Sequence, residues 1–151
     1  MKLEWDMMRR IDTYREAEAY INDIPKFSGK NSMEDTRRFL EFLGSPAQNS
    51  KIIHIAGTNG KGSVCAYLCS VLKQAGISAG MFTSPHLVTM RERFAINGGI
   101  VDEGEFLKAF RTVRGRMSDL PEELAAKSYH PSFFEFLFFM AMVLFEDAGV
   151  E

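Results

Sequence analysis

A glycine-rich stretch with one lysine, residues 57–63, has the residue types and spacing best suited to chemistry. It reads Gly-Thr-Asn-Gly-Lys-Gly-Ser and directly follows an apolar run at residues 51–56. The backbone amides of such a loop can form a concave nest of N–H donors, and a helix that follows directs the positive end of its dipole at the same place. With Lys61 adding a positive charge, the stretch predicts a site for a polyphosphate group.

The loop differs from the ordinary phosphate-binding pattern G-x-x-x-x-G-K-[ST] in two respects. Only Thr58 and Asn59 separate Gly57 from Gly60, and Gly62 stands where a hydroxyl side chain normally follows the lysine. In the ordinary pattern that hydroxyl helps to hold Mg²⁺ beside the phosphates. We therefore expect another residue to take over this task.

A strand, a helix and a second strand are expected around the loop, at 51–56, 61–75 and 77–83. The first strand is apolar on both faces, as in a buried parallel sheet, the second is also apolar, and the connection between them should be right-handed. Ligands of open α/β sheets bind beyond the carboxyl ends of the strands, so 57–63 and 84–86 should share one rim. The fold class predicted is α/β, with a P-loop-type parallel sheet flanked by helices.

Helix signals and one hairpin signal account for much of the remaining sequence. The ranges expected are an amphipathic helix at 3–24 ended by Pro25, a helix at 33–43 capped by Ser32, a hairpin at 91–100 around Asn97, and helices at 102–117 and 132–148 with capping boxes. Residues 118–131 are expected to be a polar connection. Val150 and Glu151 look like the start of a third parallel strand, which leads us to expect a piece of a longer protein.

Composition excludes several classes of partner. Lys and Arg total 18 against 20 Asp and Glu, a net charge of −2 that offers no electrostatic footprint for nucleic acid or an anionic membrane. The expected partner is a small molecule. Cys65 and Cys69, four residues apart on one expected helix, are interpreted as reduced core thiols. The N-terminus lacks an apolar signal segment, and no apolar run is long enough to span a bilayer, so a cytoplasmic protein is expected.

Three motifs together resemble one family of enzymes. Residues 57–63 resemble the ATP-binding loop of the Mur ligase superfamily, while Thr83 to Gly98 and Ser132 to Phe136 are similar to segments of folylpolyglutamate synthase, which is often bifunctional with dihydrofolate synthase. The resemblance implies an ATP-dependent ligase. ATP would phosphorylate a carboxylate of a folate or of dihydropteroate, and the α-amine of L-glutamate would attack the resulting acyl phosphate and expel phosphate.

The resemblance also implies roles for particular residues. Lys61 would be the catalytic residue, because the chemistry needs charge neutralisation at the γ-phosphoryl group. ATP would lie on Gly57, Thr58, Asn59, Gly60, Lys61, Gly62 and Ser63, and Mg²⁺ on Ser84. The pterin would contact Asp23, Ile24, Pro25 and Lys26, where the match is loose, and Ser132, Phe133, Phe134 and Glu135.

The resemblance further implies that parts of the enzyme lie outside this chain. Residues 1–151 would be the N-terminal part of the ATP-binding domain, with the rest of that domain and a C-terminal ligase domain absent. We expect the chain alone to be inactive and the full-length enzyme to be monomeric. Two alternatives stay open. Another Mur-type ligase would bind a UDP-sugar peptide instead of a folate, and a non-catalytic nucleotide-binding fragment would tolerate changes at Ser84.

Several of these residues also have purely structural interpretations. Ser84 precedes Pro85 and could simply belong to a turn, and Ser132 with Glu135 forms a capping box whatever the protein does. His54 is expected to be a core histidine of the first strand. For His86 the sequence leaves a structural and a functional role equally open. Two arginines beside the hairpin, Arg91 and Arg93, could steer an anionic substrate, although such residues are usually solvated.

Overall fold

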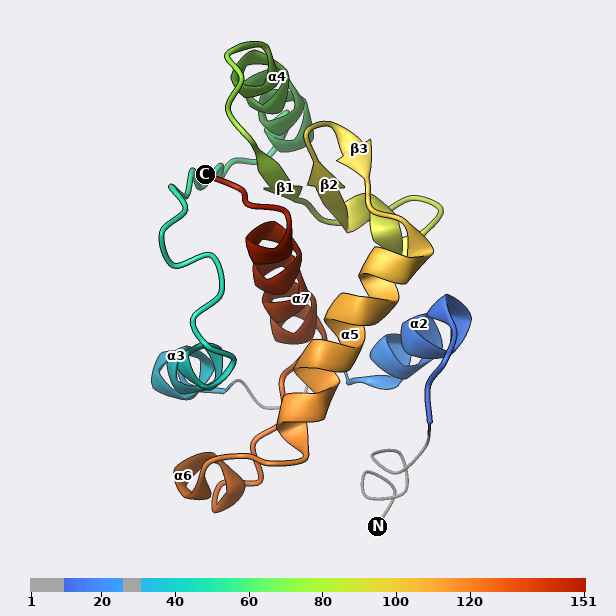
Figure 1. The fold of residues 1–151 in the computed structure, drawn as a ribbon, viewed down its shortest axis with the longest axis vertical. Helices are drawn as coiled ribbons and strands as arrows, with labels where there is room; N and C mark the ends of the chain where they lie inside the picture. Colours follow the sequence, from blue (N-terminus) through green and yellow to red (C-terminus); the bar gives the residue numbers. More distant parts are fainter. Residues whose placement is uncertain (1–9, 26–30) are drawn as a thin grey trace.

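The structure is a computed structural model that describes residues 10–25 and 31–151. Helices make up most of it, with a small sheet at one end (Figure 1). At its centre α5 (Glu103–Met117) packs against α7 (Phe133–Asp147), and α2 (Tyr14–Asp23) lies on the other side of α5. Helix α3 (Met33–Phe42) packs on α7 through Phe39 and Phe139, whose ring centroids are 4.8 Å apart.

Helix α7 supplies the middle of the core because it is apolar around most of its circumference. Buried side chains follow one another along it, including Phe136, Leu137, Phe139 and Met140, all with no exposed surface. A helix that is hydrophobic all round must be buried on several sides. Helices α5 and α3 and strand β1 (Gly80–Phe82) provide those contacts. This packing fixes the end of α7 that carries the expected substrate segment.

The sheet contains β1, β2 (Phe94–Ile96) and β3 (Gly99–Ile100), and both pairings are antiparallel. The expected hairpin is confirmed: β2 and β3 flank Asn97 and Gly98, which have φ angles of 52° and 82°. Positive φ at both central residues is typical of the tight turns that match strand twist. A short 3₁₀ helix, η1 (Met90–Arg93), leads into β2.

The expected parallel sheet is not present among the described residues. Residues 51–56 form no strand, are mostly exposed, and share no backbone hydrogen bond with another described residue. The physical reason is pairing: one edge of β1 is taken by β2, and a cavity separates its other edge from residues 51–56. The expectation that His54 is a core histidine is wrong for the same reason, because its side chain is exposed.

The helix predictions mostly agree with the structure, with differences at the ends. Ser32 caps α3, and α4 spans Lys61–Gln74 as expected. The amphipathic helix expected from residue 3 instead begins at Tyr14, because Thr13 and Glu16 form a complete capping box there; residues 3–9 lie outside the described part. The expected polar connection contains one short helix, α6 (Glu122–Ala125).

Helix α4 lies over the sheet on the side opposite α7 (Figure 1). Its half-buried residues recur at helical spacing and include Cys65 and Cys69, which are free thiols. They are not fully buried, so the expectation of core thiols is met only in part. Within the described ranges no helix is both long and apolar enough to cross a membrane.

Candidate functional site

The glycine-rich loop lies exposed at the N-terminus of α4. Gly60 is the N-cap residue and has φ 79°, a left-handed conformation that glycine adopts without strain, and Gly57 has φ 149°. No side chain of the described residues caps this helix end. The first amides of α4 therefore face solvent together with its positive dipole end, which is the arrangement that attracts phosphate groups.

Lys61 folds back over this loop. Its Nζ donates hydrogen bonds to the carbonyl oxygens of Gly57, at 2.6 Å, and Thr58, at 3.1 Å. The side chain is exposed, but its ammonium group is held against the loop by these two hydrogen bonds. This contact places a positive charge next to the amides that would surround a phosphate.

A second exposed loop, residues 84–89, follows β1 and is held by Glu92. The carboxylate accepts hydrogen bonds from the backbone amides of Leu87 (2.8 Å), Val88 (3.0 Å) and Thr89 (2.8 Å). These hydrogen bonds lower the pKa of the Glu92 carboxyl, and the bond from Leu87 has the largest effect. Ser84 itself is exposed and joined to Pro85 by a cis peptide bond. Glu92 is not among the residues expected from the sequence, although the capping-box spacing from Thr89 to Glu92 indicates such a role.

Arg93 and His86, whose roles the sequence left open, contact one another. Arg93 is only 7% exposed, and its Nε donates to Nδ1 of His86 at 2.8 Å. A guanidinium can only donate, so this ring nitrogen is the acceptor. The expectation of a solvated Arg93 is wrong, and burial lowers the pKa of its guanidinium. Arg91 is likewise engaged, donating to the carbonyl of Val101 at 3.0 Å.

Glu135 joins α7 to α3. Its two carboxylate oxygens accept from Thr36 Oγ1 (2.6 Å), from Asn31 Nδ2 (2.7 Å) and from the backbone amide of Ser132 (2.8 Å). Burial by itself would raise the pKa of this carboxyl, but the hydrogen bonds from Thr36, Ser132 and Asn31 together lower it. Both oxygens are therefore already used within the protein.

Two of the expected site segments are neighbours. Phe82, two residues before Ser84, lies 5.4 Å from Phe134, centroid to centroid, and the Arg93 guanidinium that binds His86 lies over the ring of Phe133 at 5.6 Å. Phe133 is buried, whereas Phe134 is 52% exposed. The start of α7 and the loop after β1 consequently form one continuous region.

The glycine loop approaches the same region, whereas the segment at residues 23–26 is described only as far as Pro25. Ile55, two residues before Gly57, lines the same cavity as Phe82, two residues before Ser84. The glycine loop and the loop at residue 84 therefore both begin beside this cavity. Helix α2 ends at Asp23. Asp23 and Pro25 are exposed, whereas Ile24 is buried, with 5% of its surface exposed. Lys26 lies outside the described residues.

The described residues supply little of a metal site. No group of three or more His, Cys, Asp or Glu side chains in this part of the chain is placed to hold a metal ion. Mg²⁺ prefers oxygen ligands, keeps several waters and commonly binds one or two carboxylates plus substrate phosphates. The exposed hydroxyl of Ser84 fits such an ion as one ligand only.

Comparison with known proteins gives a consistent family. No protein-family model matches the chain. The chain is 30% identical over 134 residues to the dihydrofolate synthase/folylpolyglutamate synthase of Bacillus subtilis, covering 89% of this chain and 30% of the relative. It is 32% identical over 151 residues to the mitochondrial folylpolyglutamate synthase of Bos taurus, covering 97% of this chain and 26% of the relative.

Solved structures agree with the sequence relatives. A folylpolyglutamate synthase of Mycobacterium tuberculosis complexed with ADP superposes with a TM-score of 0.80 at 29% identity, covering 91% of this chain and 30% of that chain. A solved complex named FPGS-AMPPCP-folate superposes with a TM-score of 0.81 at 28% identity, covering 92% of this chain and 33% of that chain. The fold is thus that of the N-terminal region of such enzymes. These relatives and solved structures are of the folylpolyglutamate synthase and dihydrofolate synthase family, and the chain spans 20% to 30% of the length of the first curated relatives.

Proposed function

We propose that this chain forms the ATP-phosphate-binding part of a ligase that joins L-glutamate to a folate or to dihydropteroate. The observation that carries the proposal is the exposed glycine loop at the N-terminus of α4, with the Lys61 ammonium beside it. Helix N-termini with free amides bind phosphate groups. Support comes from the solved relatives, one with ADP and one with AMPPCP and folate.

Each loop has a separate part in the proposed chemistry. The amides of Gly57 to Ser63 hold the phosphates, and Lys61 neutralises charge on the γ-phosphoryl group as it moves to the carboxylate of the substrate. Ser84 would supply one oxygen to Mg²⁺, in place of the hydroxyl that Gly62 lacks, and the ion would offset phosphate charge when bound. The amine of L-glutamate then displaces phosphate from the acyl phosphate and forms the amide.

Phe134 is the best-placed residue of the α7 start to contact a pterin ring. Its ring is 52% exposed and lies beside Phe82, so one of its faces can stack on a planar ligand. Glu135 and Phe133 contribute differently: the first holds α3 against α7, and the second is buried under Arg93. From the end of α2, Asp23 to Pro25 would approach the ring; Lys26, proposed as a further contact, lies outside the described residues.

The whole reaction is proposed for a longer protein in which residues 1–151 are the N-terminal part of the ATP-binding domain. A purified 151-residue chain should bind ATP·Mg²⁺ but release no ADP in response to L-glutamate and a folate. Steady glutamate-dependent ADP release would show that residues 1–151 suffice for the reaction and would contradict the proposal. Binding of a folate, without binding of a UDP-sugar peptide, would favour this ligase over other Mur-type ligases.

Calorimetric titration with ATP·Mg²⁺ tests the phosphate site. Lys61→Met should weaken binding by about tenfold or more, since the charge beside the phosphates is lost. Lys73→Met is the matched control, because Lys73 lies in the last turn of the same helix and should leave the affinity unchanged. Equal effects of the two substitutions would contradict the proposal.

A further inference from the structure

Two Asn-Gly pairs occur in the sequence, at residues 59–60 in the glycine loop and at residues 97–98 in the hairpin turn. Asparagine before glycine is prone to lose its side-chain amide, because glycine has no Cβ to keep its backbone nitrogen away from the asparagine side chain. The two pairs have the same sequence but different surroundings. They therefore show what the fold does to the same chemistry at two places in one molecule.

Asn97 is held in place by hydrogen bonds. Its backbone amide donates to the carbonyl of Ala79 at 2.8 Å, its Oδ1 accepts from the amide of Ala79 at 2.9 Å, and its Nδ2 donates to Ser78 Oγ at 3.4 Å. These bonds must break before Cγ of Asn97 can meet the nitrogen of Gly98. Because such local opening costs free energy, the turn protects Asn97.

Asn59 lacks this protection. It is exposed, and neither its side chain nor the backbone amide of Gly60 forms a hydrogen bond with another residue in the described ranges. Apart from its chain neighbours, Gly60 has no atom within 4 Å of the position that a Cβ would occupy. In the described part of the chain, no contact therefore has to open before the Gly60 nitrogen approaches the Asn59 side chain.

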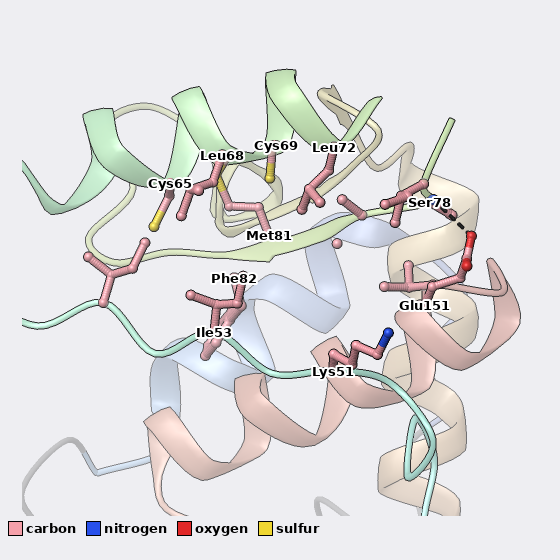
Figure 2. A pocket seen from close by; sticks show the side chains of 15 residues that line it. Lys51, Ile53, Cys65, Leu68, Cys69, Leu72, Ser78, Met81, Phe82 and Glu151 are labelled. Carbon is pink, nitrogen blue, oxygen red and sulfur yellow. Dashed lines mark hydrogen bonds between the residues drawn. The ribbon is translucent and has the colours of Figure 1, made fainter. Parts of the chain in front are cut away.

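Helix α4, which begins at Lys61, is fixed through another of its sides. Cys65, Leu68 and Cys69 point from the helix toward β1 across a cavity of about 260 Å³ (Figure 2). The positive end of α4 and the Lys61 ammonium therefore stay beside Asn59. Positive potential stabilises the negative oxygen that forms when a nitrogen adds to the side-chain carbonyl. The features that attract phosphate consequently favour this reaction as well.

We propose that Asn59 is a site of spontaneous deamidation, and that the reaction inactivates the phosphate site when no nucleotide covers it. The backbone nitrogen of Gly60 gives up its proton and attacks Cγ of Asn59. A new C–N bond forms, and the bond from Cγ to Nδ2 breaks as ammonia leaves. Water then opens the cyclic imide: addition at Cγ gives aspartate, and addition at the backbone carbonyl gives isoaspartate. No oxidant or reductant takes part.

Either product places a negative charge in the loop that is proposed to hold phosphates, and isoaspartate also lengthens the backbone there. Like charges at close range repel one another, so ATP binding should be lost. This consequence rests on the proposed function, whereas the reaction itself does not. A phosphate group bound to the loop amides would keep the Gly60 nitrogen away from Asn59. ATP·Mg²⁺ should therefore protect the residue that its absence exposes.

Peptide mass spectrometry of the chain, kept in mildly alkaline buffer without nucleotide, tests the reaction. We expect Asn59 to convert about tenfold faster than Asn97, or faster still, while circular dichroism shows that the chain stays folded. Both aspartate and isoaspartate should appear at residue 59, because the cyclic imide opens in two ways. Asn59→Gln is the control, since its longer side chain closes a ring more slowly. Equal conversion of Asn59 and Asn97 in the folded chain, or aspartate without isoaspartate, would overturn the proposal.

Calorimetric titration of the aged chain with ATP·Mg²⁺ tests the consequence. The number of binding sites per chain should fall in step with the converted fraction of Asn59, whereas it should stay constant in Asn59→Gln. Saturating ATP·Mg²⁺ during the incubation should slow conversion of Asn59 and leave that of Asn97 unchanged. Full conversion that leaves ATP binding intact would overturn the inactivation. If Asn59 converts but even the fresh chain does not bind ATP, only the proposed function fails.

Discussion

Nε of Arg93 lies 2.8 Å from Nδ1 of His86, and this contact connects the loop after β1 to the start of α7. The guanidinium is buried and also lies over the ring of Phe133. A buried charge is tolerated only when it is paired or hydrogen-bonded. The relative position of the loop at residue 84 and the segment at residue 132 therefore depends on this bond.

Replacing His86 should destabilise the protein more than replacing its partner. His86→Ala leaves a buried charged donor without this acceptor, which costs about 1–3 kcal/mol. Arg93→Met removes the charge together with the need for an acceptor, so it should cost less, and the double variant should resemble Arg93→Met. Urea unfolding of the four proteins measures this. Additive effects would mean that the two side chains do not interact energetically.

Replacing Glu92 should loosen the loop at residues 87–89. Glu92→Ala removes the acceptor of three backbone amides, and we expect those amides to exchange about tenfold faster. Glu105→Ala is the control, since Glu105 forms an equivalent capping box at the start of α5. Exchange at residues 87–89 that responds equally to both substitutions would contradict this role.

Two glycines of the glycine-rich loop should respond to alanine in opposite directions. Gly60 has φ 79°, so Gly60→Ala should destabilise the protein by about 1 kcal/mol although no atom lies near the new methyl group. Gly62 lies inside α4 with open space around it, and Gly62→Ala should stabilise the helix by about 0.5 kcal/mol. Thermal unfolding distinguishes the two. A stabilising Gly60→Ala would show that the left-handed N-cap is not present in solution.

Glu135 should contribute stability that depends on pH. Its pKa is lower in the folded protein than the ordinary value of 4.5, so the contribution is fully present above about pH 5 and is lost as the pH falls through the folded-state pKa. Glu135→Gln should cost about 1–2 kcal/mol at pH 7. The difference from the parent protein should shrink as the pH is lowered from 5 to 3.

Urea unfolding across that range provides the measurement, and Glu122→Gln, on the exposed first turn of α6, is the control. Glu92 and Asp35 also have lowered pKa values and remain in both proteins, so only the difference between parent and variant reports on Glu135. A difference that stays constant from pH 7 to pH 3 would contradict the assignment.

Local signals predicted much of the fold. The capping boxes at Asp102 and Ser132, the N-cap at Ser32 and the Asn97–Gly98 turn all depend on interactions within a few residues, and each has the expected geometry. The prediction of a parallel sheet was wrong because pairing between distant segments is not a local property. An apolar, β-branched run such as 51–56 indicates a buried strand only if a partner strand occupies the space beside it.

The candidate site could be predicted to a similar extent. The glycine loop and Ser84 were recognisable from residue types, but the contacts that position them were not. The Arg93 bond to His86 and the Glu135 bonds to Asn31 and Thr36 join residues that the sequence pattern treats as separate surface charges. Long-range side-chain pairing of this kind leaves no periodic signal in one sequence.

The central claim is that the phosphates of ATP bind at the glycine loop and that the Ser84 loop lies within reach of them. Nuclear magnetic resonance of the ¹⁵N-labelled chain, titrated with ATP·Mg²⁺, tests this claim most directly. We predict that the amide signals of Gly57 to Ser63 and of Ser84 and His86 shift together, while those of α2 stay in place. Saturable shifts confined to other residues, with the amides of Gly57 to Ser63 unchanged, would contradict the account.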